Sequence, residues 1–480
     1  MTNHVSRDRK ITSSALAVLF GILILLYSRS TMRLLGFSDR LDQRCVFYAN
    51  ILCYALFGVV VLWRGARLRL LLSDTYAQIV LLSYCATVIP NILSAYILYS
   101  QPLMGIIRTF FWYGGWALLL ALVLWGPDVV LAFRLLRVFA LLGVVAAAFA
   151  CVVALFPGLR ALLVSDTVVS ERFGLTRIII LPGPVQFALY FYLASLLYVK
   201  QDRAKALQFI FCVIVTFAYI FFVCLTRETI LATCVVLVYF ALRYLPERIR
   251  RGHILIGLSL VLVILYAAGG FSIVKRSVQS AYEGHSGDVS SFNSRVDSIR
   301  YSWNQLRETG YVGTGKISTV HGGRNPIRDA FEAGEVNWVD VGILGTVGLY
   351  GIPVLLLVAA AFWKSFKDVA LIRDSSLAPP MVASAIAIEL FILANILEFG
   401  VTFFHEVTAY YYALVFFVLS TFTSQARKAH AVGYPRVKGS IRVPLHGTRA
   451  IRAYNRSTGV FASPPLICEN RCIVAYRSWF

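Results

Sequence analysis

Twelve apolar runs, each long enough or nearly long enough to cross the hydrocarbon core of a membrane, constrain this chain more than any other feature. A membrane-spanning α-helix needs about 20 such residues. Because lipid offers no hydrogen-bond partners to the backbone, we expect each run to be helical. The sequence therefore predicts an all-α polytopic membrane protein with about twelve transmembrane helices. The predicted spans are residues 11–28, 45–63, 75–99, 103–125, 135–156, 178–199, 207–225, 229–245, 254–272, 338–363, 381–400 and 407–422.

Composition excludes a water-soluble enzyme. Hydrophobic residues make up 59% of the chain and charged residues 14%, whereas a soluble domain carries about 25% charged residues. The net charge of +21 would suggest nucleic acid as a partner of a soluble protein. In a membrane protein the same excess is usually topological, because basic residues hold short loops in the cytoplasm. We therefore expect the lipid bilayer, and no nucleic acid, as a partner.

The distribution of basic residues predicts which side each loop faces. Short segments on the side of the N-terminus carry 18 Lys and Arg, and those on the opposite side carry 8. This bias places both chain ends in the cytoplasm. The first run has the length of a retained helix and no small-residue cleavage site after it, so we do not expect a cleaved signal peptide.

One long polar stretch divides the chain, and the topology places it outside the cytoplasm. It combines acidic and basic residues with Gly and Ser clusters, and residues 294–308 have a helical pattern. We expect a small folded cap between helices 9 and 10. The predicted parts are residues 1–272 with helices 1–9, residues 273–337 with the extracytoplasmic loop or cap, residues 338–422 with helices 10–12, and residues 423–480 with a basic cytoplasmic tail.

Neither the cysteines nor the acidic residues form a metal-binding pattern. Most of the nine cysteines lie in or at the ends of apolar runs, where cysteine behaves as a small hydrophobe; six of them are Cys45, Cys53, Cys151, Cys212, Cys224 and Cys234. Cys468 and Cys472 form a C-x3-C pair without a second pair nearby. A D-x-D motif and a histidine cluster are both missing. We expect no metal ion and no cofactor.

A set of predicted outside arginines is not explained by topology. Arginine near a bilayer costs a few kcal/mol unless it is paired or faces water, so these positions are functional candidates. The alternatives are snorkelling to the interface and, for Arg227, a structural pair with Glu228. Guanidinium groups bind phosphate oxygens in pairs and stay charged. A lipid diphosphate or the anionic solute of a transporter would suit them equally. The candidates are Arg108, Arg172, Arg177, Arg227, Arg295 and Arg300.

Four segments, in order, resemble elements of the O-antigen ligase and polymerase superfamily of membrane glycosyltransferases. Each lies at a predicted loop or helix end, and together they extend over roughly residues 160–363. They are Glu171-Arg172-Phe173-Gly174 with Pro182-Gly183-Pro184-Val185-Gln186-Phe187; Thr226-Arg227-Glu228-Thr229; Ser294-Arg295 to Trp303 with Gly310-Tyr311-Val312-Gly313-Thr314-Gly315; and Asp340-Val341-Gly342-Ile343-Leu344-Gly345 with Gly348-Leu349-Tyr350-Gly351.

The resemblance implies a metal-independent glycosyltransferase at the outer face of a bacterial cytoplasmic membrane. It would transfer a polyprenyl-diphosphate-linked glycan to a sugar hydroxyl on another lipid-linked unit. A flippase and a chain-length regulator are further candidate partners. In the ligase branch a histidine stands where this chain has Asn337, which favours the polymerase branch.

Site residues follow from the resemblance together with the outside charges. We expect Arg172, Arg227 and Arg295 to contact the diphosphate, supported by Arg177 and Arg300. Asp340 is the first candidate general base and Glu335 the second, and Trp303 is a candidate substrate contact. For Asp340 the structural alternative is a carboxylate that stabilises a helix N-terminus. Glycines 342, 345, 348 and 351 suit close helix packing at least as well as a ligand. For Glu389 and Glu398 an internal pair with arginine is favoured over a proton relay.

Two other functions stay open. A ligase would pass a finished glycan to lipid A-core. A secondary transporter or flippase would also suit twelve helices, although the two halves of the chain show no convincing similarity and the large loop is asymmetric.

Overall fold

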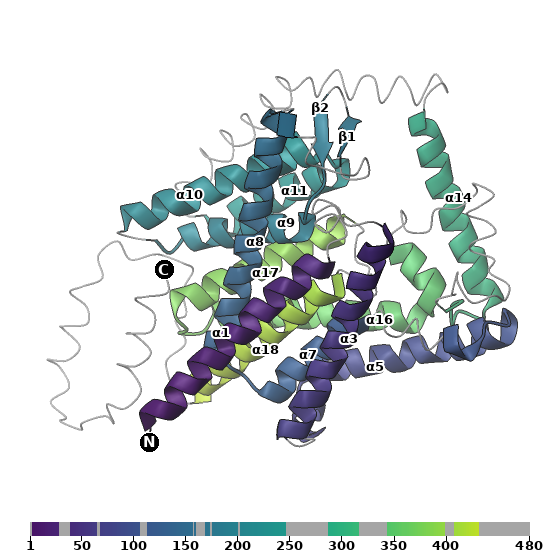
Figure 1. Cartoon of the computed structure of the whole chain (residues 1–480), viewed down its shortest axis with the longest axis horizontal. Helices are drawn as coiled ribbons and strands as arrows, with labels where there is room; N and C mark the ends of the chain where they lie inside the picture. The colour runs from purple at the N-terminus through teal and green to yellow at the C-terminus, as the bar shows by residue number, and fades with distance from the viewer. Residues whose placement is uncertain are drawn as a thin grey trace, which may run out of the picture.

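A computed structural model describes residues 2–27, 39–64, 68–105, 113–156, 158–159, 169–172, 175–199, 202–245, 287–315, 343–398 and 408–431. This described part is a bundle of helices with one two-stranded sheet (Figure 1). Two of the helices, η1 and η4, are π-helices that continue α5 and α10. The helices are α1 (Thr2–Tyr27), α3 (Asp39–Arg64), α4 (Leu68–Ser73), α5 (Thr75–Pro90), η1 (Asn91–Leu98), α7 (Gly114–Trp125), α8 (Val129–Leu155), α9 (Pro182–Leu196), α10 (Arg203–Ala218), η4 (Tyr219–Cys224), α11 (Arg227–Tyr244), α14 (Gly287–Glu308), α16 (Ile343–Arg373), α17 (Pro379–Leu397) and α18 (Thr408–Ala431).

Six segments of the described chain are helical, long and apolar enough to cross a membrane. They support a multi-pass helical membrane protein. Three shorter apolar helices, Ser13–Leu26, Gly114–Trp125 and Thr229–Tyr244, coincide with further predicted spans. The predicted ninth span, 254–272, lies outside the described residues, so the number twelve and the sidedness of the loops stay predictions. The six segments are Arg44–Trp63, Thr75–Leu98, Val129–Leu155, Arg203–Cys224, Val347–Arg373 and Pro379–Leu397.

Two helices, α8 and α10, begin directly after an aspartate that caps them. Asp128 accepts hydrogen bonds from the backbone amides of Val130 and Leu131, at 2.9 and 3.1 Å, and so starts α8. Asp202 accepts from the Lys205 amide at 3.1 Å at the start of α10. Each aspartate satisfies amides that a helix leaves unpaired at its first turn. These boundaries are therefore fixed by local chemistry.

The centre of the bundle is built from α8, α9, α17 and α18. Phe139 of α8 lies 5.0 Å from Phe187 of α9 and 5.1 Å from Tyr411 of α18, measured between ring centroids. Gly143 lets α8 approach α9, because an added Cβ would lie 2.1 Å from the Pro184 carbonyl oxygen. In Figure 1, α1 and α8 cross in front of α17 and α18.

The outer helices expose apolar side chains instead of covering them. Leu62 of α3 is 85% exposed and Leu207 of α10 is 67% exposed. Exposed apolar surface of this extent marks an interaction surface, here one suited to lipid.

The fold departs from the all-α prediction at one place. Strands β1 (Val169–Arg172) and β2 (Leu175–Ile178) pair antiparallel, with Val169 opposite Ile178 and Arg172 opposite Leu175. The sixth span was predicted to begin at 178, but α9 begins at Pro182. The reason is visible in the sequence: alternating apolar and polar residues with β-branched side chains surround Phe173-Gly174, a turn of hairpin length.

Two other boundaries refine the predicted organisation. The helix predicted at 294–308 is confirmed as α14, which begins earlier, at Gly287, and ends at Glu308. Helix α18 continues to Ala431, beyond the predicted end of the last span at 422. Residues 432–480 of the predicted tail lie outside the described part.

Candidate functional site

Arg177 joins the hairpin to the turn before α11. Its Nε donates to the Cys224 carbonyl oxygen and its Nη2 to Thr226 Oγ1, both at 3.1 Å. Close by, the Tyr219 hydroxyl accepts from the Ile180 amide at 2.8 Å and donates to the Ile180 carbonyl at 3.0 Å. The exit of the hairpin is therefore held against η4. π-Helical turns of this kind are frequent at functional sites.

The same region contains two more of the predicted arginines. Arg227 is the first residue of α11 and directly follows Thr226. Arg172 is the last residue of β1. Arg177 pairs directly with Ser170, and residues 170 and 172 lie on the same face of β1 because side chains alternate along a strand. Positions 172 and 177 therefore share one face of the hairpin. The side chains of Arg172 and Arg227 lie outside the described part. The fold thus gathers three predicted site positions, of which Arg177 makes structural contacts.

A polar pair that was not among the predicted site residues closes this end of the bundle. Gln186, in the first turns of α9, donates from Nε2 to Glu398 Oε1 at 2.6 Å. Glu398 directly follows α17. Gln186 stands in the Pro-Gly-Pro-Val-Gln segment of the resemblance, and that signal could have identified it. An arginine partner was predicted for Glu398, and the amide of Gln186 is one partner that the structure gives it.

Glu389 confirms the internal pairing predicted for it. Its carboxylate lies 3.8 Å from Arg243 Nε and accepts hydrogen bonds from the Tyr239 and Tyr244 hydroxyls. Glu389 is 5% exposed. This carboxylate links α17 to α11 and belongs to the packing of the bundle.

A second region forms where the loop after α14 meets a break in α16. Gly351 has φ 79° and ψ −179°, so the helix is interrupted there. Residues 311–315, which we call the strap, run beside the break. The Ile352 amide donates to the Tyr311 carbonyl at 3.1 Å, and the Thr314 and Gly315 amides donate to the Gly348 and Leu349 carbonyls at 3.2 and 2.7 Å.

Pro353 explains why the strap binds at this point. In a continuous helix the Leu349 carbonyl would accept from the amide of residue 353, and proline has none. The Gly315 amide takes that place. Two segments of the family resemblance, the glycine-rich loop and the glycine-rich start of the next helix, are therefore joined backbone to backbone.

Two glycines of this junction are in close contact with neighbouring segments. A Cβ on Gly348 would lie 3.0 Å from Ser302 Cβ of α14, and one on Gly313 would lie 2.4 Å from the Leu349 carbonyl oxygen. From η1, Ser94 Oγ donates to the Gly313 carbonyl at 2.6 Å. The junction thus combines α14, the strap, α16 and η1.

The remaining predicted residues on α14 do not meet the hairpin within the described part. Helix α14 packs against α16, whereas β2 packs against η4 and α8, and Figure 1 shows α14 at the side of the bundle. Arg300 lies 3.6 Å from Asp297 and both are exposed. Trp303 is 54% exposed, as a substrate contact requires. Arg295 belongs to α14, but its side chain, like Arg108, Glu335, Asn337 and Asp340, lies outside the described residues.

Comparison with known families gives no support from whole-chain similarity. No protein-family model matches the chain, and no curated protein matches it significantly.

Proposed function

We propose that this protein is a bacterial polysaccharide polymerase of the cytoplasmic membrane. It transfers a polyprenyl-diphosphate-linked glycan to a sugar hydroxyl of another lipid-linked unit at the outer face. One observation supports the proposal above all: segments that resemble one family, although far apart in sequence, touch in pairs. Arg177 of the hairpin binds Thr226 of the Thr-Arg turn, and Gly315 of the loop binds Leu349 of α16.

The chemistry needs a site that stabilises a leaving diphosphate. The bond between the anomeric carbon and the diphosphate oxygen breaks while the acceptor oxygen bonds to that carbon. Negative charge then grows on the diphosphate, and preorganised guanidinium groups stabilise it. Arg172, Arg227 and Arg295 take this role in the proposal, with Arg300 in support.

A carboxylate must accept the proton of the acceptor hydroxyl. Asp340 is our first candidate and Glu335 the second, because both stand shortly before α16 in the sequence, the helix to which the strap is hydrogen-bonded. A general base contributes only if it lies within hydrogen-bond reach of that proton. Trp303, exposed on α14, supplies an aromatic surface for a sugar ring.

The first experiment is deletion of the gene in its own bacterium. We expect loss of long surface polysaccharide and accumulation of single lipid-linked repeat units. Full-length polymer accumulating on the polyprenyl carrier would instead identify a ligase. Unchanged glycan, with a change in uptake or export of a solute, would identify a transporter.

The second experiment tests the arginines one by one. Lysine keeps the charge and loses the planar fork, so Arg227→Lys and Arg295→Lys should each lose most polymer synthesis at normal protein levels. A lost charge-assisted bond of about 1.5–3 kcal/mol corresponds to roughly 10- to 150-fold in rate. Arg307→Lys, exposed on the same helix as Arg295, and Arg160→Lys in a predicted outside loop are the matched controls. Near-normal polymer synthesis by both Arg227→Lys and Arg295→Lys would contradict the proposed binding of the diphosphate by these arginines.

A further inference from the structure

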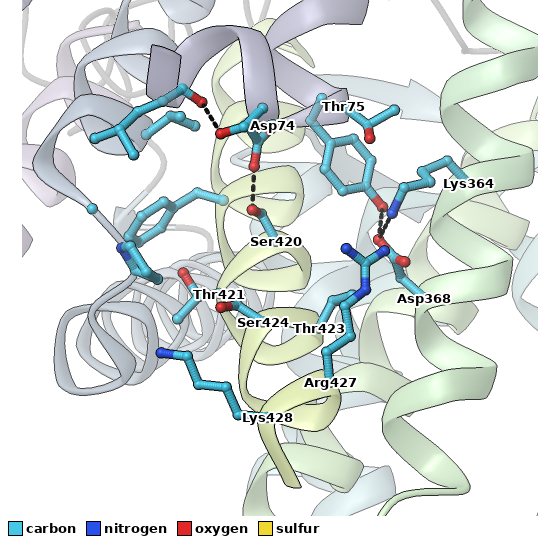
Figure 2. A pocket seen from close by; sticks show the side chains of 17 residues that line it. Asp74, Thr75, Lys364, Asp368, Ser420, Thr421, Thr423, Ser424, Arg427 and Lys428 are labelled. Atoms are coloured by element: carbon cyan, nitrogen blue, oxygen red, sulfur yellow. Dashed lines mark hydrogen bonds and ion pairs between the residues drawn. The ribbon is translucent and has the colours of Figure 1, made fainter. Parts of the chain in front are cut away.

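One cavity of the described part lies far from the hairpin. It has a volume of about 400 Å³ and opens between the α4–α5 corner, the loop before α8, α16 and the end of α18 (Figure 2). Tyr411 of α18 packs against Gly183 beside the hairpin, and the cavity reaches Ser424, so the two sites are about 20 Å apart along α18 at 1.5 Å per residue. The charge bias places this end of the bundle in the cytoplasm.

Both acidic side chains of the cavity already have partners. Asp368 accepts from the Tyr76 hydroxyl at 3.0 Å and forms an ion pair with Lys364. Asp74 caps α5 by accepting from the Ala77 amide at 2.9 Å, and it also accepts from the Ser420 hydroxyl. The dashed lines in Figure 2 include the contacts of Asp368 with Tyr76 and Lys364 and of Asp74 with Ser420. Both carboxylates therefore bind groups of the cavity wall and do not form a cation site.

Two hydroxyl groups in the wall of the cavity, by contrast, are buried and have no partner among the described residues. Thr421 and Thr423 are 1% and 4% exposed, and their hydroxyls have no hydrogen-bond partner in the described part of the chain. A buried polar group without a partner costs free energy, so each such group calls for a ligand or water. Both threonines line the cavity.

Two basic residues line the same cavity as these hydroxyls. Arg427 and Lys428 are exposed and pair with no carboxylate among the described residues. In Figure 2 the Arg427 guanidinium points toward the Lys364–Asp368 pair, so a second cation faces a carboxylate that is already neutralised. The cavity therefore has three basic side chains against two satisfied acids, which favours an anion.

We propose that this cavity binds a phosphate group, carried either by an anionic lipid headgroup or by a soluble phosphate compound. Arginine and lysine hold the phosphate oxygens and the threonine hydroxyls donate to them. A volume of about 400 Å³ lies within the range of small-molecule sites. The inference is independent of the proposed transferase activity.

The test uses the full-length protein, purified and delipidated in a neutral detergent. One arm adds dihexanoyl phosphatidylglycerol and the other adds inorganic phosphate, each against chloride at equal ionic strength, and thermal unfolding is followed. We expect at least one arm to raise the midpoint of the wild-type protein. The doubly substituted Arg427→Gln/Lys428→Gln protein should lose that rise, and Arg203→Gln, an exposed basic residue at the same predicted side, should keep it.

A second variant protects the test against misfolding. Thr421→Val keeps the shape and removes one donor, so we expect about tenfold weaker binding. Stabilisation in the lipid arm alone identifies a headgroup, and stabilisation in the phosphate arm identifies a soluble ligand. Absence of stabilisation in both arms, or equal stabilisation of wild-type and Thr421→Val proteins, would overturn the proposal.

Discussion

Replacing Gly351 with Ala puts a methyl group into the junction between α16 and the strap. Gly351 has φ 79° and ψ −179°, a conformation essentially restricted to glycine, so strain alone costs on the order of 1–3 kcal/mol. An added Cβ would lie 2.4 Å from the Val312 carbonyl oxygen and 2.5 Å from that of Tyr311. Because the contacts are with backbone, no side chain can rotate away.

Release of the strap from α16 relieves this clash. Release breaks three backbone hydrogen bonds, each worth about 1 kcal/mol net, so the penalty is limited to ~3 kcal/mol. A penalty of about 2 kcal/mol corresponds to roughly 30-fold more frequent opening. The amides of Thr314, Gly315 and Ile352 should then exchange with solvent deuterium about 30-fold faster.

Hydrogen–deuterium exchange with mass spectrometry on the detergent-solubilised protein measures this directly in peptides that contain the strap and the break in α16. Gly310→Ala is the matched control, because Gly310 also has a positive φ of 61° but no atom within 4 Å of an added Cβ. A folded Gly351→Ala protein with wild-type exchange in both peptides would refute the backbone junction.

Three further outcomes are expected. A cysteine at Ser290, in a protein whose native cysteines are replaced, should react with an impermeant thiol reagent in intact spheroplasts; protection would contradict the predicted topology. Glu389→Leu leaves two tyrosine hydroxyls of α11 without their acceptor, at about 1–3 kcal/mol each, so its thermal midpoint should fall further than that of Glu389→Gln; equal midpoints would argue against these bonds. Gly143→Ala, with a backbone clash at 2.1 Å, should yield little folded protein by size-exclusion chromatography, whereas Gly58→Ala, with open space around it, should yield wild-type amounts; similar yields would contradict the close contact of α8 and α9.

The hydrophobic runs predicted most of the described helices. They placed the starts of two spans at 135 and 207, whereas Asp128 and Asp202 cap α8 and α10 earlier, at Val129 and Arg203. Such caps are local signals that are readable in a single sequence. The hairpin was missed because four-residue strands that contain Glu171 and Arg172 give a weaker pattern than the apolar run after them.

Contacts between distant segments could not be predicted. The partners of Arg177 include a backbone carbonyl, that of Cys224, and carbonyls have no signature in a sequence. The cavity at the end of α18 was missed for a related reason: Thr421 and Thr423 lie at the end of an apolar helix, and only folding brings them beside Lys364 and Asp74.

The break in α16 has a consequence for the order in which the protein is assembled. Pro353 leaves the Leu349 carbonyl without a partner from its own helix, and the Gly315 amide completes it. A helix inserted into lipid with an unsatisfied carbonyl is penalised by several kcal/mol. The strap precedes α16 in the chain, so the ribosome has already delivered it when α16 emerges. Membrane insertion of α16 and docking of the strap are therefore coupled steps of biogenesis. A substitution in the loop that prevents docking of the strap would also disturb the insertion of α16, because the two segments are joined by backbone hydrogen bonds.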